Sequence, residues 1–247
     1  MKRTDPGIYR LLAWLFTLVA AAAGQAAAEP PDFSGIWTWY VVPGQSPFSR
    51  TTPELPFNEA ARKKVEEYRA LVAPNGDNAG GWCLGTGMPG SMLSSGGYPM
   101  EIIQRPEQIT IIYEAHQEIR RIFIGTDRYP EADLLPDRNG YSEGHWEGET
   151  LVVETIHLKE QVDQTYAHSA DARITERYRL SRTEDGQPIL EAELSMTDPA
   201  FYTETVTALK RWSPVPGGRL LSYECNEPAW EEHVEDLRKA AAGGSAR

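Results

Sequence analysis

Apolar and polar residues alternate through most of the second half of the chain, which is the pattern of strands with one buried face. In residues 189–196, Leu190, Ala192 and Leu194 fall on one face, and acidic residues or serine fall on the other. Turn residues separate such stretches at short intervals, which is typical of an antiparallel barrel or sandwich. Strands are predicted over residues 33–42, 100–104, 108–115, 118–124, 150–156, 173–181, 189–196, 204–212 and 219–224.

Three segments interrupt this β pattern. Residues 58–72 place Ala61, Val65 and Tyr68 near helical spacing between charged residues, so a helix is predicted there. A polar helix is also predicted over residues 229–242. Residues 74–99 have no period and are rich in glycine and serine. Loops of this length are usually functional or covalently tied, so we expect this one to form a lid or plug over a cavity.

Residues 140–157, GYSEGHWEGETLVVETIH, carry the clearest hairpin signal. Gly148 between two glutamates predicts a tight turn, and the β-branched run that follows predicts a strand. His145 and Trp146 stand just before the turn, so polar and aromatic groups are expected at the mouth of a hairpin. Ligands enter barrels at their mouths, and the sequence therefore predicts a ligand cavity.

The first 28 residues have the pattern of a cleaved secretory signal peptide. A basic start precedes the apolar run 11–23, and small residues precede Glu29. A membrane anchor is the weaker interpretation, because this run is shorter than the ~20 residues of a spanning helix. We expect a single domain over residues 29–247, periplasmic or secreted, with no membrane span after cleavage.

Composition narrows the expected partners. The chain has 24 basic and 36 acidic residues, for a net charge of −12, so binding to nucleic acid or an anionic membrane is not expected. Its two cysteines are Cys83 and Cys225, and an oxidising compartment favours a disulfide between them. Metal-ligand spacings and nucleotide-binding motifs are missing from the sequence, so neither a metal nor a cofactor is expected.

Ionisable residues on the predicted strands could carry acid–base chemistry. Glu176 and Tyr178 share a face with Ile174, and they point into the barrel if that face is the inner one. An inward acid beside a tyrosine needs partners, or its pKa rises, which suits a general acid or base. The other candidates for proton transfer are Glu114, His145 and His168.

The competing interpretation is structural. Glu176 could belong to an outward ladder of ion pairs with Arg177 or Arg121. In the catalytic interpretation the same two arginines would bind an anionic group of the substrate. The aromatic candidates for contact with a ligand are Trp37, Tyr113 and Trp146.

Several segments together resemble a family of exported bacterial proteins of largely unassigned function. Residues 140–155 are similar to its hallmark, GxSxGxWEGDTLVVET, with Glu149 in place of the usual aspartate. Other similar segments are DFSGIW at 32–37, EIIQ at 101–104, HS at 168–169, ERY at 176–178, TDP at 197–199 and YEC at 223–225. The resemblance implies an exported location and a lipocalin-like barrel.

The first predicted strand carries a second resemblance. Gly35-Ile36-Trp37 is similar to the G-x-W signature of lipocalin-like (calycin) barrels. In that family the tryptophan closes the barrel floor against an arginine of the last strand. Arg211 or Arg219 would be the partner here, through a cation–π contact.

We therefore expect a mainly β fold, an antiparallel lipocalin-like β-barrel with a long helix and loop excursion near the N-terminus and a short C-terminal helix. The first functional hypothesis is a cofactor-free lyase, isomerase or cyclase acting on a hydrophobic or aromatic small molecule in the barrel cavity. The alternatives are a carrier of hydrophobic ligands and an interaction domain with a packed barrel. Acids, bases and arginines that converge on a cavity would favour an enzyme. A cavity with apolar walls would favour a carrier, and a solid interior would favour an interaction domain.

Overall fold

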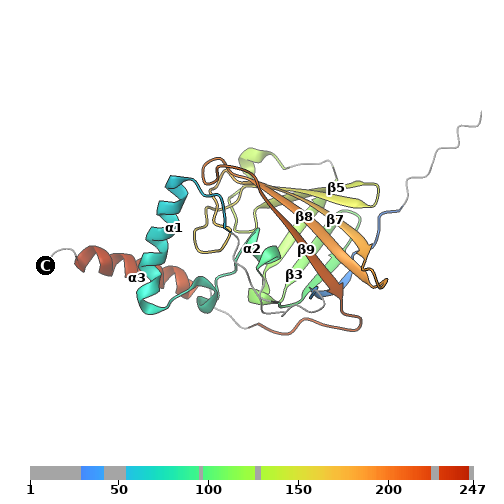
Figure 1. Cartoon of the computed structure of the whole chain (residues 1–247), viewed down its shortest axis with the longest axis horizontal. Helices are drawn as coiled ribbons and strands as arrows, with labels where there is room; N and C mark the ends of the chain where they lie inside the picture. Colours follow the sequence, from blue (N-terminus) through green and yellow to red (C-terminus); the bar gives the residue numbers. More distant parts are fainter. Residues whose placement is uncertain (1–28, 42–53, 95–96, 126–128, 224–227, 245–247) are drawn as a thin grey trace, which may run out of the picture.

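The structure is a computed structural model that describes residues 29–41, 54–94, 97–125, 129–223 and 228–244. Nine strands form one closed barrel, in which each strand lies beside its neighbour in the chain (Figure 1). The strands are β1 Gly35–Trp39, β2 Met100–Gln104, β3 Gln108–Tyr113, β4 Ile119–Ile124, β5 Tyr141–Glu147, β6 Thr150–Ile156, β7 Arg173–Arg182, β8 Pro188–Thr197 and β9 Val206–Pro214. The prediction of a mainly β barrel is confirmed.

Strand direction departs from the prediction at one place. β4 and β5 are parallel, with Ile122 opposite Ser142, whereas the other eight neighbouring pairs are antiparallel. A wholly antiparallel barrel is therefore wrong, because the chain between β4 and β5 returns to the end where β4 began. The barrel is mixed.

The predicted strand at 219–224 is also wrong for the residues that the structure describes there, 219–223. β9 already pairs with β8 on one side and with β1 on the other, so the barrel has no edge left for a further strand. Instead, the backbone N–H of Leu221 donates to Oε2 of Glu114 at 2.6 Å.

The helices gather at one end of the barrel (Figure 1). α1 Glu59–Val72 begins at Asn58, whose side chain accepts a hydrogen bond from the N–H of Ala61, as N-cap residues do. α3 is Pro228–Gly244, the short α2 is Gly90–Leu93, and 3-10 turns form at η1 Ala73–Asn75, η2 Ala79–Trp82, η3 Ala115–Gln117 and η4 Glu131–Asp133. None of the helices within the described ranges is long and apolar enough to cross a bilayer.

The opposite end of the barrel is closed by aromatic side chains. Trp37 is buried, and its Nε1 donates to the carbonyl of Phe33 at 2.8 Å. Phe33 in turn packs on Trp146, with ring centroids 5.3 Å apart. Among the described residues neither candidate arginine makes a cation–π contact with Trp37. Arg211 pairs with Glu191 on the outer face, and Arg219 lines a surface hollow of about 550 Å³ together with Trp37. In the described part of the chain, the cation–π contact of the last strand is Lys210 over Trp39.

Candidate functional site at the plugged end of the barrel

A buried ion pair occupies the middle of the barrel. Arg120 of β4 is 1% exposed and Glu176 of β7 is 0% exposed. Nη1 of Arg120 donates to Oε1 of Glu176 at 2.9 Å, and Nη2 donates to the second carboxylate oxygen. Two parallel N–H···O bonds of this kind fix both groups and neutralise their charges within the low-dielectric interior.

Hydroxyl groups from three strands complete this cluster. Nη2 of Arg120 donates to Oγ of Ser142 at 3.1 Å and to Oγ1 of Thr155 at 2.9 Å. The hydroxyl of Tyr178 donates to Oε1 of Glu176 at 2.7 Å. Ser142 and Thr155 face each other across the β5–β6 hairpin. We refer to these five residues as the inner cluster.

The electrostatics of the inner cluster favour hydrogen-bond donation. Burial raises the pKa of Tyr178 well above its usual value, and the Glu176 charge raises it further. Burial also raises the pKa of Tyr113, which lies close to Arg120. Although burial alone would lower it, the Glu176 carboxylate raises the pKa of Arg120. Both phenols therefore stay protonated and the guanidinium stays charged at neutral pH.

Residues 84–93 fill the end of the barrel nearest the helices, and we call this segment the plug. Met88 and Met92 are fully buried in the barrel core, and the sulfur of Met92 lies 3.6 Å from the hydroxyl oxygen of Tyr178. The carboxylate of Glu118 accepts hydrogen bonds from Gly87 N at 2.8 Å, Ser91 Oγ at 2.9 Å and Thr86 N at 3.1 Å. One acid thus anchors both ends of the plug's central turn.

His168 also holds the plug. Its Nε2 lies 3.0 Å from the carbonyl of Met88, and its Nδ1 lies 2.9 Å from the carbonyl of Ser169. The side chain is 0% exposed, and burial lowers its pKa despite these carbonyls. Both ring nitrogens of His168 therefore face backbone oxygens, and one of these belongs to the plug.

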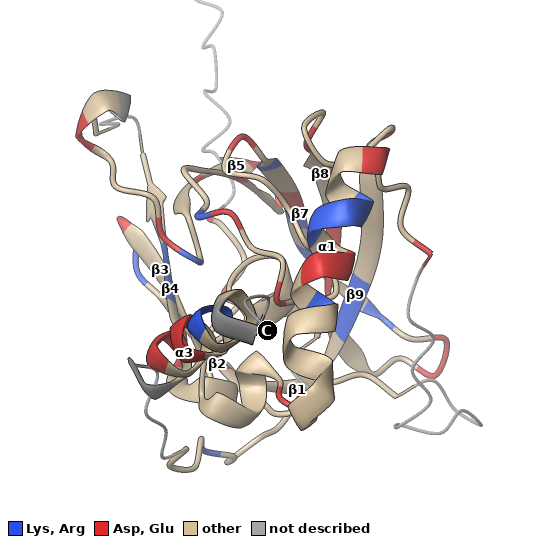
Figure 2. Ribbon diagram, turned by 90° about the vertical axis from the view of Figure 1, so that its left-hand side faces the viewer, with Lys and Arg blue, Asp and Glu red and all other residues tan. Residues whose placement is uncertain are grey.

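Two hollows flank the plug. The smaller one has a volume of about 100 Å³ and is lined by Thr86, Ser91, Ser94, Tyr98, Tyr113, Ala115, His116 and Glu118. The larger, about 330 Å³, lies between α1, α3 and residues 159–163. Figure 2 looks onto this end of the molecule, where α1 and α3 stand in front of the barrel and α1 carries charges of both signs.

Some of the predicted site residues come together and others do not. Glu176, Tyr178 and Tyr113 all point inward, as the alternation of β7 indicated for the first two. Glu114 lies at the β3–β4 connection and is bonded to the Leu221 backbone. Trp37 and Trp146 lie at the far, aromatic end of the barrel.

Three predicted residues lie outside the barrel. Arg121 is exposed, because its neighbour Arg120 takes the inward position of β4. Arg177 also faces outward, and its Nη2 donates to Glu147 at 2.7 Å. The side chain of His145 is 57% exposed and lies 3.3 Å from the same glutamate. Arg121 and Arg177 therefore do not line the barrel interior, where the catalytic interpretation would need them.

Cys83 is disulfide-bonded, as expected, while Cys225 lies outside the described residues. Arg120, Ser142, Thr155 and Glu118 did not figure among the sequence candidates. No local signal singled out Arg120, because Arg120 shares a strand face with Ile122 just as Arg121 shares one with Ile119. Ser142 and Thr155 gave a weak signal, as small polar residues placed opposite each other in a hairpin.

Comparison with known proteins leaves the chain unassigned: no protein-family model matches it, and no curated protein matches it. Within the ranges that the structure describes, histidine, cysteine and acidic side chains do not gather in a group of three that could hold a metal ion.

Proposed function

We propose that this chain is an exported small-molecule-binding protein whose ligand sits at the plugged end of the barrel. The proposal rests on one observation: the ionisable side chains inside the barrel bond to other groups of the protein. The inward acids are used by the protein itself, whereas hollows open to either side of the plug. Binding is therefore better supported than turnover by the residues first considered for catalysis.

Each of the buried acid–base candidates already makes hydrogen bonds within the protein. Glu176 accepts hydrogen bonds from Arg120 and Tyr178, Glu114 accepts from the backbone of Leu221, and both ring nitrogens of His168 face carbonyls. A general base must reach the proton that it removes. Each of these groups would have to leave its present hydrogen-bond partner before it could do so.

The larger hollow has the volume of a small-molecule site. Ligand pockets combine apolar walls with a few placed polar groups and usually exceed about 300 Å³. The larger hollow reaches that size at about 330 Å³. The smaller one, at about 100 Å³, is below the roughly 150 Å³ of a cavity that holds benzene. A hydrophobic or aromatic ligand therefore suits the larger hollow.

The sequence supports the remaining parts of the proposal. The pattern of residues 1–28 favours export, although these residues lie outside the described ranges. The block at 140–155 and the G-x-W at 35–37 support a lipocalin-like relationship, and barrels of that kind carry small molecules. A plug inside the barrel would make this chain an unusual carrier, with its ligand beside the barrel mouth.

Native mass spectrometry of protein purified from its own host tests the proposal. We expect a bound small molecule whose mass disappears when the protein is unfolded, and the same adduct on an Arg177→Ala control. Hydrogen exchange should show ligand-dependent protection in residues 84–93 and 230–238. A polypeptide mass without adduct, together with no thermal shift from a panel of hydrophobic and aromatic compounds, would refute the proposal.

A cofactor-free acid–base enzyme is the second candidate, favoured by the smaller hollow. Tyr113, a protonated phenol beside Arg120, shares this hollow with His116 and Ser91. A donor and an imidazole around one small space could move a proton of a carbonyl compound. Deuterium uptake into acetone from D₂O should then be catalysed, and Tyr113→Phe should abolish it while the exposed Tyr98→Phe should not. No exchange above the buffer rate would exclude this candidate.

A further inference from the structure

Tyr68 lines the larger hollow, and its hydroxyl is buried there without a partner in the described part of the chain. Oη of Tyr68 is inaccessible to solvent and has no hydrogen-bond partner among the described residues. Burial, with Asp163 as the next contribution, raises the pKa of Tyr68 to about 12. The group is therefore a protonated donor at neutral pH. Leaving such a donor unpaired in the interior is unfavourable, so an acceptor supplied by a ligand would stabilise it.

The helix pattern explains why Tyr68 points there. On α1, Val65 and Val72 lie three and four residues away and are both buried, so Tyr68 falls on the same face of the helix. Val65 packs into the barrel core, and Val72 packs into a second core with Trp230 and Val234 of α3. Tyr68 packs against this second core, beside the hollow between the two helices.

The wall formed by α3 is fixed by contacts with the loop before the plug. Trp82 stacks on His233 with ring centroids 4.1 Å apart. Nε2 of His233 lies 2.6 Å from Oδ2 of Asp77, whose other oxygen accepts from Trp82 Nε1 at 3.2 Å. The same helix turn presents Trp230 to the hollow. The apolar wall is thus built into the fold.

The charged groups around the hollow balance one another. Its lining includes Arg138, Lys159 and Arg238 together with Glu160, Asp163 and Glu231, which sum to zero formal charge. Arg138, the most buried of the cations, already donates to Asp163 at 3.1 Å and to the carbonyl of Gly85 at 2.7 Å. A carboxylate ligand would find no buried cation free of an acidic partner, whereas a neutral acceptor needs only the phenol.

We infer that the hollow lined by Tyr68, Leu84, Val162, Trp230 and Val234 binds a neutral, carbonyl-bearing molecule with an apolar or aromatic body. Its body would lie against Trp230 and the aliphatic side chains. Its carbonyl oxygen would accept the hydrogen bond of Tyr68 once a rotation of the phenol brings the buried hydroxyl to the surface of the hollow. This inference rests on the proposed binding function and gives it a site and a ligand class.

Three probes of similar size test the ligand class: acetophenone, benzoate and ethylbenzene, each titrated by NMR. The wild-type protein should bind acetophenone most tightly. Tyr68→Phe should weaken acetophenone binding by roughly 3- to 10-fold and leave ethylbenzene unchanged. Tyr98→Phe, the same chemical change in the smaller hollow, should leave acetophenone binding at the wild-type value. The unfolding free energy of Tyr68→Phe should equal or exceed that of the wild type, because the hydroxyl has no partner to lose.

Other results of these titrations would each contradict one part of the inference: the donor, the ligand class or the site. Equal acetophenone affinity for the wild type and Tyr68→Phe would remove Tyr68 as the donor, and tightest binding of benzoate would remove the neutral ligand class. If none of the probes binds, the hollow is not the site. A native adduct that persists in Tyr68→Phe would still support the binding function at the other side of the plug.

Discussion

Strand β7 has charged side chains on both faces, buried in an ion pair on the inner face and exposed to solvent on the outer face. Toward the interior, Glu176 and Tyr178 join Arg120 in a cluster that water does not reach. Toward solvent, Arg177 pairs with Glu147 of β5, and Arg179 pairs with Glu191 of β8. An inward cluster and outward ion pairs thus occur one position apart, because successive side chains of a strand point to opposite faces.

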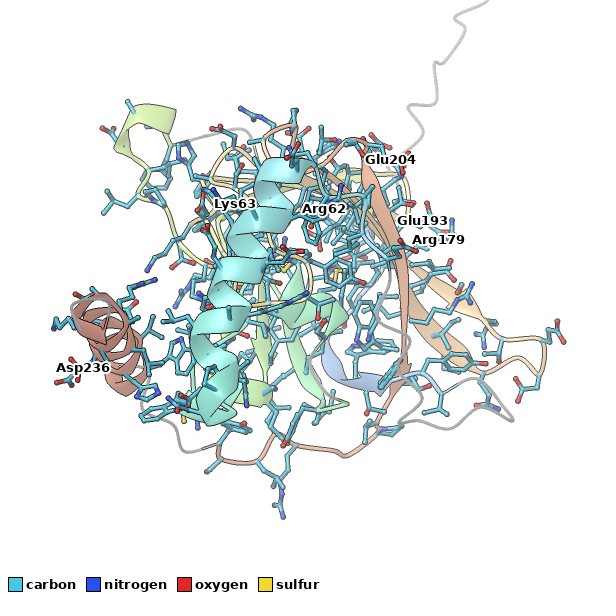
Figure 3. All side chains as sticks on the ribbon, turned by 60° about the vertical axis from the view of Figure 1, so that its left-hand side comes forward. Arg62, Lys63, Arg179, Glu193, Glu204 and Asp236 are labelled. Carbon is cyan, nitrogen blue, oxygen red and sulfur yellow. The ribbon has the colours of Figure 1, made fainter. Side chains whose placement is uncertain are left out.

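The ion pairs on the two faces of β7 differ in how much they contribute to the stability of the fold. Arg179 is 52% exposed and bonds Glu191 and Glu193, and Figure 3 shows Arg179 and Glu193 projecting together from the outer surface. Such pairs contribute little because water and salt compete for them. An inner pair has no competitor, so the loss of one partner leaves a charge stranded in a low dielectric. The same residue types therefore have very different importance on the two faces.

The largest effect is expected from breaking the inner pair. Arg120→Met should lower the free energy of unfolding by about 3–5 kcal/mol, because Glu176 is left buried without its counter-ion. Urea denaturation measures this loss. Arg120→Met combined with Glu176→Leu should be less destabilised than Arg120→Met alone, since the stranded charge is then gone. A single variant within about 1 kcal/mol of the wild type would contradict the comparison.

A smaller effect is expected from the most protected acid of the outer face. Burial tends to raise the pKa of Glu191, but hydrogen bonds from Arg211 and Arg179 outweigh it and lower the pKa below its usual value. A carboxylate with a lowered folded pKa adds stability above its unfolded pKa, and this is lost as the pH falls through the folded value. Glu191→Gln should therefore flatten the loss of stability between about pH 5 and about pH 3. An unchanged acid profile would show that the two arginines do not stabilise this carboxylate.

The smallest effect is expected at the pair of Arg177 and Glu147, whose side chains are 45% and 50% exposed. Arg177→Ala should change the free energy of unfolding by no more than about 0.5 kcal/mol, and less still in high salt. Thermal unfolding at two salt concentrations measures this. A loss comparable to that of Arg120→Met would mean that the two faces are not energetically distinct.

Local patterns in the sequence predicted the strands better than they predicted the site. Alternation placed Glu176 and Tyr178 inward on β7 because Ile174 marked the buried face. On β4 the sequence Ile119-Arg120-Arg121-Ile122 offers an isoleucine to both faces, so the pattern cannot choose between the two arginines. That choice depends on the register with β3 and β5, which only the assembled barrel defines.

Non-local structure accounts for the other differences. Residues 219–223 have strand-like composition but meet a barrel that is already closed by β1 and β9. The plug has no period of its own, and its position is set by Glu118 and His168, which lie far away in the sequence. Tyr68 looked like one apolar position of an amphipathic helix. Its unpaired hydroxyl became visible only once α3 packed alongside.

The parallel pair of β4 and β5 follows from simple parity. If every strand in a ring ran opposite to both neighbours, directions would alternate, and alternation around a closed ring requires an even number of strands. A nine-membered ring must therefore contain a pair that runs the same way. A relative of this protein that had gained or lost one strand could dispense with the long return link before β5.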